Sequence, residues 1–235
     1  MKRLLGDIRR ADERFHLIGE NARVAVGLSG GKDSMALLAL LAAYRAIKPF
    51  SLCALTIVPK GRMNPSPLEA LCESLAVPLY QKESALFDTL FQGGQKNPCA
   101  LCARVRRGTL VSMAKARGCD TLALGHHLDD ALETLLMALL KEGRFHTLAP
   151  KSHMARGELW VIRPLILTRE HEIEAFCARA GITPVKNPCP VDHKTTRQEM
   201  KALLARAEAL YPDVKDRLEG ALLKESFFMK PEQSD

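Results

Sequence analysis

The sequence predicts a three-layer α/β/α fold, a doubly wound parallel sheet with one helix before it and a helical extension after it. Short apolar runs of strand length alternate with longer helical segments, a pattern typical of parallel strands joined by crossover helices. Residues 24–34 contain a strand, a glycine turn and a helix start in direct succession. The 235 residues and the apolar fraction of 47% suffice for one such domain with a substantial core.

The elements follow in order. Residues 1–22 are expected to form a basic, partly amphipathic helix that either packs on the domain or contacts nucleic acid. Strands are predicted near residues 24–28, 50–58, 78–82, 121–124 and 160–165, and helices near residues 35–41, 68–76, 99–117, 128–142 and, capped by Thr168, 169–180. Residues 143–156 show neither the helical nor the strand periodicity of apolar residues and are predicted to be a substrate-contacting loop. Residues 195–228 should form two helices divided at Tyr211-Pro212.

The glycine loop, residues 29–34, joins the first strand to the first crossover helix. Its two glycines let the backbone approach a ligand, and the unpaired N–H groups of the helix start favour an anion such as phosphate. A lysine adds a cation, two serines add hydroxyl donors, and Asp33 is suited to hold magnesium or to cap the helix. The predicted phosphate-binding residues are Ser29, Gly30, Gly31, Lys32, Asp33 and Ser34. A capped turn that binds nothing is the simpler alternative.

The histidine–aspartate motif, residues 125–134 (GHHLDDALET), also lies between a strand end and a helix start. The carboxyl ends of parallel strands share one edge of the sheet, so this motif should lie beside the glycine loop. Gly125 and His126 are expected to contact the nucleotide, and Asp130 is, with Asp33, a candidate magnesium ligand. The simpler alternative is that Asp129 or Asp130 only caps the helix.

Seven cysteines are present. Cys53, Cys72, Cys119 and Cys177 lie in predicted strands, at a strand entrance or on apolar helix faces, so core packing is expected for them. Cys99 and Cys102 form a CxxC pair at a helix start near three arginines, which favours thiolates. With Cys189 in a proline-rich loop they could hold zinc, completed by a histidine such as His193, or an iron–sulfur cluster. Residue chemistry alone leaves both open.

The charge balance is modestly basic, with 34 lysines and arginines against 27 acidic residues. Such an excess fits a phosphate-backbone partner without proving one. The low aromatic content of 5% argues against recognition of single strands mainly by stacking. No apolar run has membrane-spanning length and the start of the chain has no signal-peptide pattern, so a cytoplasmic protein is expected. The expected units are residues 1–22 (basic helix), 23–185 (nucleotide domain) and 186–235 (late-cysteine loop and terminal helices packed on that domain).

The motifs resemble a known superfamily. SGGKDS looks like the PP-loop of the ATP pyrophosphatases, which have a Rossmann-like fold, and GHHLDDALET resembles the second motif of PP-loop enzymes that modify tRNA. Together with the CxxC helix running into RVRRG, the IRPL segment followed by Arg169-Glu170, and the late Pro-Cys, the chain is similar to the tRNA 2-thiocytidine synthetase (TtcA) family over most of residues 1–215. The C-terminus is shorter than in many members, and Pro190-Val191-Asp192 stands where other members can have a second cysteine.

The resemblance implies an ATP-dependent tRNA sulfurtransferase. ATP and Mg²⁺ would adenylate the C2 oxygen of a cytidine, at position 32 of the anticodon loop, and sulfur would replace it through a [4Fe-4S] cluster held by Cys99, Cys102 and Cys189. Implied partners are tRNA and a sulfur donor such as a cysteine desulfurase, with a homodimer as a further expectation. Candidate tRNA contacts are Arg104, Arg106, Arg107, Lys151 and Arg197. Alternatives are a lysidine-synthetase-like ligase, a small-molecule amidating enzyme and a metal-bearing RNA-binding protein without turnover.

Overall fold

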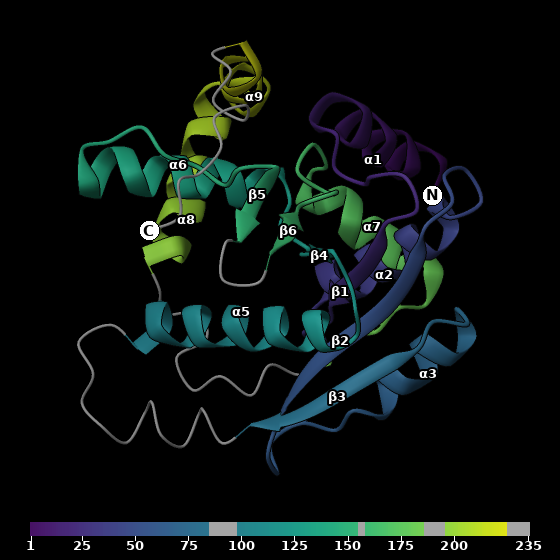
Figure 1. Ribbon diagram of the computed structural model, residues 1–235. Coiled ribbons are helices and arrows are strands. Elements are labelled where there is room, and N and C mark those ends of the chain that lie inside the picture. The colour runs from purple at the N-terminus through teal and green to yellow at the C-terminus, as the bar shows by residue number, and fades with distance from the viewer. Residues whose placement is uncertain (85–97, 155–157, 186–195, 225–235) are drawn as a thin grey trace.

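The computed structural model describes residues 1–84, 98–154, 158–185 and 196–224 (Figure 1). Among these residues, six strands form one sheet in the order β3-β2-β1-β4-β6-β5. Of the strands described, β5 alone runs antiparallel to its neighbour, and the others pair in parallel. The strands are β1 (Arg23–Gly27), β2 (Ser51–Pro59), β3 (Leu79–Ser84), β4 (Thr121–Ala123), β5 (Lys151–Met154) and β6 (Leu159–Ile162). The predicted doubly wound α/β fold is confirmed.

The central strands are apolar on both faces because helices cover both sides of the sheet. Along β1, Val24 and Val26 belong to one buried cluster, whereas Ala25 between them belongs to a second. Parallel strands buried on two faces read as nearly continuous apolar runs. The two clusters therefore mark the two layers of helices.

The first cluster packs beneath α1 (Lys2–Phe15), α2 (Lys32–Tyr44), α3 (Ser66–Ser74), α6 (Leu128–Glu142) and α7 (Glu170–Ala180). The second cluster packs beneath α5 (Pro98–Ala116), which runs along the opposite face (Figure 1). α8 (Thr196–Leu210) and α9 (Val214–Lys224) are the C-terminal helices, and they gather against α6, far from β3. The predicted division of this segment at Tyr211-Pro212 is confirmed.

Three local expectations are corrected. The helix expected over residues 1–22 ends at Phe15, because His16 adopts a left-handed conformation with φ 49°. The loop predicted over residues 143–156 contains the edge strand β5, whose four residues pair with β6. Thr168 does not cap α7, since Arg169 is the N-cap residue and the buried Thr168 hydroxyl has no hydrogen-bond partner among the described residues.

The cysteines expected in the core are only partly confirmed there. Cys53, Cys72 and Cys177 are buried, with exposed fractions of 9%, 2% and 5%. Cys119 is half-buried rather than buried. It lies in the turn before β4, where it packs against the second cluster and also lines a small cavity.

One buried carboxylate joins α1 to α2. Asp12 accepts hydrogen bonds from the Ile18 backbone N–H at 2.8 Å, the Tyr44 hydroxyl at 3.0 Å and the Lys48 ammonium at 2.7 Å. Its exposed fraction is 3%. Since buried polar groups destabilise the folded state when they lose their partners, this carboxylate fixes the turn that leads from α1 into β1.

We expect Asp12→Ala to lower the free energy of unfolding by about 3 kcal/mol, because three donors lose their acceptor in a buried position. Urea titration followed by circular dichroism measures the change. The matched control is Glu13→Ala, whose carboxylate is 68% exposed and lies 3.6 Å from Arg9, and which should cost less than about 0.5 kcal/mol. Equal losses in the two variants would contradict the anchoring role of Asp12.

Candidate active site

The glycine loop connects β1 to α2 at the carboxyl edge of the sheet. Gly30 adopts φ +87°, a conformation that L side chains rarely adopt. Its carbonyl accepts a hydrogen bond from the Val185 backbone N–H at 2.8 Å, and a Cβ at Gly30 would lie 3.1 Å from the Val185 side chain. The loop is thus held by the segment that follows α7, and residue 30 must be glycine for two separate reasons.

The two serines stabilise the loop from within. The Ser29 backbone N–H donates to Ser34 Oγ at 3.1 Å, and Ser34 Oγ donates to the Gly31 carbonyl at 2.9 Å. Gly31 is the N-cap residue of α2 and supplies no side-chain hydrogen bond to the helix start. The first N–H groups of α2 therefore remain suited to an anion, as the sequence predicted for phosphate.

Gly125 places the histidine–aspartate motif against this loop. A Cβ on Gly125 would lie 3.0 Å from the Asp33 carbonyl carbon and 3.0 Å from the Ser34 nitrogen, both backbone atoms. β1 and β4 are paired neighbours, and the chain diverges from β1 in opposite directions at this point. This is the topological switch point, where open α/β sheets bind ligands.

His127 caps α6 and is buried, with an exposed fraction of 4%. Its Nδ1 accepts from the Asp130 backbone N–H at 3.3 Å, and Asp130 Oδ2 accepts from the His127 backbone N–H at 3.0 Å. The N-cap residue is therefore His127, and Asp130, one of the two expected capping residues, completes the capping box. The second oxygen of Asp130 accepts from the Arg197 guanidinium at 2.5 Å. Both oxygens of Asp130 thus have protein partners.

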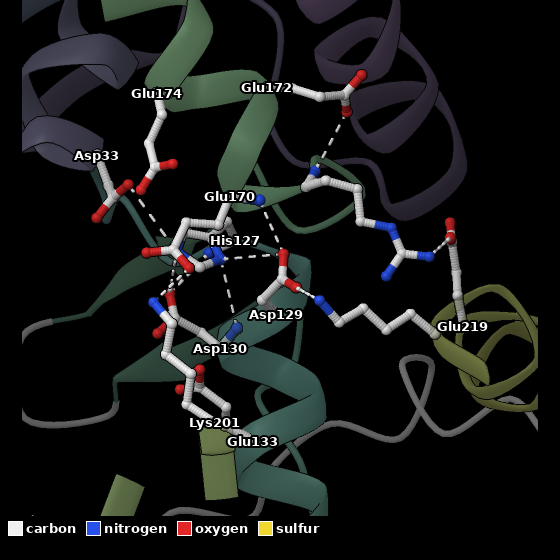
Figure 2. A network of polar contacts seen from close by, with 12 residues as sticks. Asp33, His127, Asp129, Asp130, Glu133, Glu170, Glu172, Glu174, Lys201 and Glu219 are labelled. Carbon is white, nitrogen blue, oxygen red and sulfur yellow. Dashed lines mark hydrogen bonds and ion pairs between the residues drawn. The ribbon is translucent and has the colours of Figure 1, made fainter. Parts of the chain in front are cut away.

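Lys32 of the glycine loop forms an ion pair with Glu170, the first residue of α7. Glu170 accepts from Lys32 at 2.8 Å through one oxygen and from Lys201 of α8 at 2.6 Å through the other. Figure 2 shows Glu170 and Lys201 side by side. Burial would raise the pKa of Glu170, but the hydrogen bonds from Lys201 and Lys32 lower it to about 2. Glu170 is therefore a permanent anion that connects the glycine loop to the C-terminal helices.

Four further ion pairs tie the same edge to the C-terminal helices, and Figure 2 shows those made by Asp129 and Glu219. Asp129 accepts from the Glu170 backbone N–H at 2.8 Å and pairs with Lys215 of α9 at 3.1 Å. Arg197 of α8 also lies 3.7 Å from Glu133. Arg169 forms ion pairs with Asp216 and Glu219 of α9. Arg197, a predicted tRNA contact, and Lys201 therefore face the acidic groups of the site.

His126 is held by a buried arginine. The Nε–H of Arg163 donates to His126 Nδ1 at 3.3 Å, and Arg163 is 2% exposed. Burial and the Arg163 charge together lower the pKa of His126 to about 3. The ring is therefore neutral at physiological pH, with Nδ1 as the acceptor and Nε2–H left as a donor.

Glu133 lies one turn beyond Asp130 on α6 and is 4% exposed. Burial and the neighbouring Asp130 charge raise its pKa to about 7, although Arg197 acts in the opposite direction. A carboxyl group with this pKa exchanges its proton near neutral pH. Sequence reasoning did not single out Glu133, because its burial depends on how α8 covers α6.

Asp33 is the carboxylate best suited to a cation. Its Oδ1 is buried and accepts no hydrogen bond among the described residues, although it lies 3.2 Å from Lys32 Nζ. A buried carboxylate oxygen without a hydrogen bond is an open ligand position for Mg²⁺. Asp130, the other predicted ligand, would have to release Arg197 to bind metal. Within the described part of the chain, histidine, cysteine and acidic side chains form no group of three arranged to bind a metal.

The predicted cluster cysteines are only partly described. Cys102 lies half-buried in α5. The side chain of Cys99, in the first turn of α5, and all of Cys189 lie outside the described residues, as does His193. The structure therefore leaves the predicted set of three thiolates as a prediction.

The predicted tRNA-contacting residues fall into three groups. On α5, Arg104 and Arg107 are exposed and Arg106 is half-buried. Lys151, on β5, donates to the His16 carbonyl and lies over the Trp160 ring at 4.7 Å. Arg197 is occupied by Asp130 at the site itself. The α5 arginines are thus the candidates most accessible to a nucleic acid.

Glu170 is the main functional residue that motif reading underestimated. The sequence analysis named Glu170 as part of the family resemblance but gave it no role in the site. Glu170 follows β6, the strand next to β4. Because loops after neighbouring parallel strands converge, this position in the chain was the signal that Glu170 would lie at the site. The Leu128 N–H donates to the Thr168 carbonyl at 2.9 Å, which confirms that these two loops touch.

Comparison with known proteins agrees with this geometry. The PP-loop domain family matches residues 7–208. A tRNA-cytidine(32) 2-sulfurtransferase from Pelobacter propionicus is 34% identical over 94% of this chain and 85% of its own length. A tRNA-cytidine(32) 2-sulfurtransferase from Geobacter metallireducens is 36% identical over 94% of this chain and 89% of its own length.

The fold has a close counterpart among solved structures. The U34-tRNA thiolase NcsA from Methanococcus maripaludis, solved with its [4Fe-4S] cluster, superposes with a TM-score of 0.79 at 23% identity. The match covers 100% of this chain and 83% of the thiolase. Because the sequence identity is only 23%, this superposition shows that the two proteins share a fold.

We expect Gly125→Ala to lower the free energy of unfolding by about 1–3 kcal/mol, because its methyl group would press on the backbone at Asp33 and Ser34. It should also weaken ATP binding, measured by calorimetric titration. The control is Gly108→Ala on α5, where a Cβ meets nothing within 4 Å. Because alanine has the higher helix propensity, this variant should have a free energy of unfolding about 0.5–1 kcal/mol higher than the unmodified protein. A Gly125 variant as stable as the Gly108 variant would refute the close-approach argument.

Proposed function

Because the chain belongs to the PP-loop domain family, and within it to the tRNA-cytidine(32) 2-sulfurtransferases, we propose that it thiolates a cytidine of tRNA at the expense of ATP. The observation that carries the proposal is the convergence of three loops at the carboxyl ends of β1, β4 and β6. The glycine loop, the histidine–aspartate motif and the start of α7 bring anion donors, a carboxylate and two lysines to one place.

The glycine loop binds the phosphates of ATP in this proposal. The first N–H groups of α2, with Gly30 and Gly31 allowing close approach, receive the pyrophosphate, and the Ser29 and Ser34 hydroxyls position the loop. Lys32 moves from Glu170 to the phosphates, so ATP competes with an acidic side chain for the same ammonium. The neutral His126 offers Nε2–H as a hydrogen-bond donor near the nucleotide.

The adenylation step makes the cytidine oxygen a leaving group. The C2 oxygen attacks the α-phosphate and pyrophosphate departs, since oxygen on a pyrimidine ring leaves poorly without activation. Asp33 would hold Mg²⁺ through its buried Oδ1, and the ion would neutralise charge that develops on the phosphates. Asp130 would join it only after Arg197 has moved.

Cys99, Cys102 and Cys189 are proposed to hold a [4Fe-4S] cluster. When bound, the cluster supplies the sulfur chemistry that replaces the activated oxygen. The donor set of three thiolates fits such a cluster, and leaves one iron without a protein ligand. The archaeal thiolase with the similar fold is described with its [4Fe-4S] cluster, which supports the proposal without locating the cluster here.

The partners follow from the reaction. The tRNA is proposed to lie across the exposed arginines of α5, Arg104 and Arg107, with Arg106 beside them. Sulfur would come from a donor such as a cysteine desulfurase, and a homodimer is a further proposal. No helix in the described ranges is long and apolar enough to cross a membrane. We propose a cytoplasmic location, where tRNA is available.

The C-terminal helices are proposed to couple tRNA binding to the ATP site. Ion pairs through Glu170, Asp130, Asp129 and Arg169 join these helices to the site. A tRNA phosphate near Lys201 or Arg197 would compete for these cations and change the charge around Lys32. Tight ATP binding and tRNA docking would then favour the same rearrangement.

Two rival functions remain distinguishable. A lysidine-synthetase-like ligase shares the ATP chemistry but uses an amine nucleophile and needs no displayed cysteines. A metal-bearing RNA-binding protein would bind tRNA without releasing pyrophosphate. The curated relatives are named sulfurtransferases, which favours thiolation.

Thiolation predicts about four iron and four sulfide ions per chain after anaerobic purification, the content of one [4Fe-4S] cluster. Cys189→Ala should lose most of both, and should stop formation of 2-thiocytidine in tRNA, detected by mass spectrometry of nucleosides. The control is Cys72→Ala, a buried core thiol, which should keep its iron. Zinc in place of iron, or 2-thiocytidine formed by the Cys189 variant, would reject the proposal.

Glu170→Gln tests the coupling. Removing the anion leaves Lys32 and Lys201 without their shared partner, so ATP should bind about fivefold more tightly. Stimulation of pyrophosphate release by tRNA should fall about tenfold, because α8 is no longer tied to the glycine loop. Glu174→Gln is the control, since Glu174 lies 3.9 Å from Lys32 and its side chain is 56% exposed. Identical behaviour of the two variants would exclude coupling through Glu170.

A further inference from the structure

A small cavity opens at the amino ends of β1 and β2, at the edge of the sheet opposite the glycine loop. Its volume is about 120 Å³, and its lining includes Arg23, Cys53, Tyr80, Arg117 and Cys119. None of these residues belongs to the motifs assigned to ATP or to the cluster. Two cysteines and two arginines around one opening are an unusual combination for a surface hollow.

The two sulfur atoms are in contact. Cys53 Sγ lies 3.7 Å from Cys119 Sγ, although the residues are far apart in sequence. Cys53 points from β2 and is 9% exposed, whereas Cys119 is half-buried. Two features fix Cys119: Gly118 before it adopts φ +66°, and its own N–H donates to the Ala114 carbonyl at 2.9 Å. Both thiols line the cavity, and Cys119 is the more exposed of the two.

The contact between the two sulfur atoms favours a thiolate on Cys119. The hydrogen bond with Cys53 lowers the pKa of Cys119 and Arg23 acts in the same direction, whereas burial and the Asp120 charge raise it. The same contact, with burial, raises the pKa of Cys53. The Arg117 guanidinium lies over the Tyr80 ring at 3.8 Å, which keeps a second cation at the opening. An accessible low-pKa thiol beside a second thiol is the usual arrangement of a redox-sensitive pair.

We propose that Cys53 and Cys119 form a redox-active thiol pair, in which Cys119 reacts with a hydroperoxide and Cys53 completes a disulfide. The Cys119 thiolate attacks one peroxide oxygen, the O–O bond breaks, and water leaves, so that Cys119 becomes a sulfenic acid. The Cys53 sulfur then attacks the Cys119 sulfur and expels a second water. Two thiols are oxidised by two electrons while one hydrogen peroxide molecule is reduced to two water molecules.

The pair differs from the two buried cysteines Cys72 and Cys177. Cys72 is 2% exposed, and burial raises its pKa to about 11. Cys177 is also buried, with its pKa raised by burial and its thiol directed at the Lys32 carbonyl at 3.6 Å. A reagent that oxidises thiolates should therefore distinguish Cys119 from Cys72 and Cys177.

Peptide mapping of the full chain tests the proposal directly. The protein is treated with hydrogen peroxide, remaining thiols are alkylated, and trypsin digestion follows without reduction. Cys53 is the one cysteine in the tryptic peptide 46–60, Cys119 is the one in 118–141, and Cys72 is the one in 63–82. We expect peptides 46–60 and 118–141 to be joined by a disulfide. The fraction of Cys119 that can still be alkylated should fall about tenfold faster with time in peroxide than the same fraction of Cys72.

Two variants separate the roles of the thiols. In Cys53→Ser, peroxide should leave a sulfenic acid on Cys119 that dimedone traps, because the resolving thiol is gone. In Cys119→Ser, Cys53 should remain a thiol that is alkylated after unfolding. The proposal is overturned if Cys53 and Cys119 can still be alkylated after the other thiols have been oxidised, or if Cys119 and Cys72 react at equal rates. It is also overturned if peroxide oxidises Cys53 to the same extent in Cys119→Ser as in the unmodified protein.

Discussion

The candidate site depends on the close approach of Gly125 to the backbone at Asp33 and Ser34. This contact exists because β1 and β4 are paired neighbours, so the loops that follow them leave the sheet side by side. A side chain at residue 125 would separate the glycine loop from the histidine–aspartate motif. The steric freedom of one glycine thus determines whether His127, Asp130 and the start of α2 share one site.

Electrostatics then connects this site to the end of the chain. Glu170 is placed between Lys32 of the loop and Lys201 of α8, and Asp130 is placed between the α6 cap and Arg197. Both acidic groups therefore have one partner in the site and another in the C-terminal helices. Such an arrangement makes the charge state of the site depend on whatever binds those helices, which suits an enzyme with a polyanionic substrate.

The cysteines fall at opposite ends of the sheet. Cys102 lies near the amino end of α5, on the side proposed for cluster and tRNA, whereas Cys53 and Cys119 lie at the amino ends of the strands. The length of α5 lies between Cys102, near its start, and Cys119, just beyond its end. Oxidation of the pair can therefore be measured on peptides that contain none of the cluster cysteines.

The sequence by itself determined the strand and helix order, the two nucleotide motifs and the family resemblance, because alternating apolar runs and glycine-rich turns are local signals. Only the tertiary structure decided which charges meet: that Glu170 holds Lys32, that Arg197 faces Asp130 rather than solvent, and that Cys119 touches Cys53. It also revealed β5, whose four residues are a strand only through pairing with β6. The reason is physical, since these contacts join residues distant in sequence and depend on how packed elements cross, which no local pattern encodes.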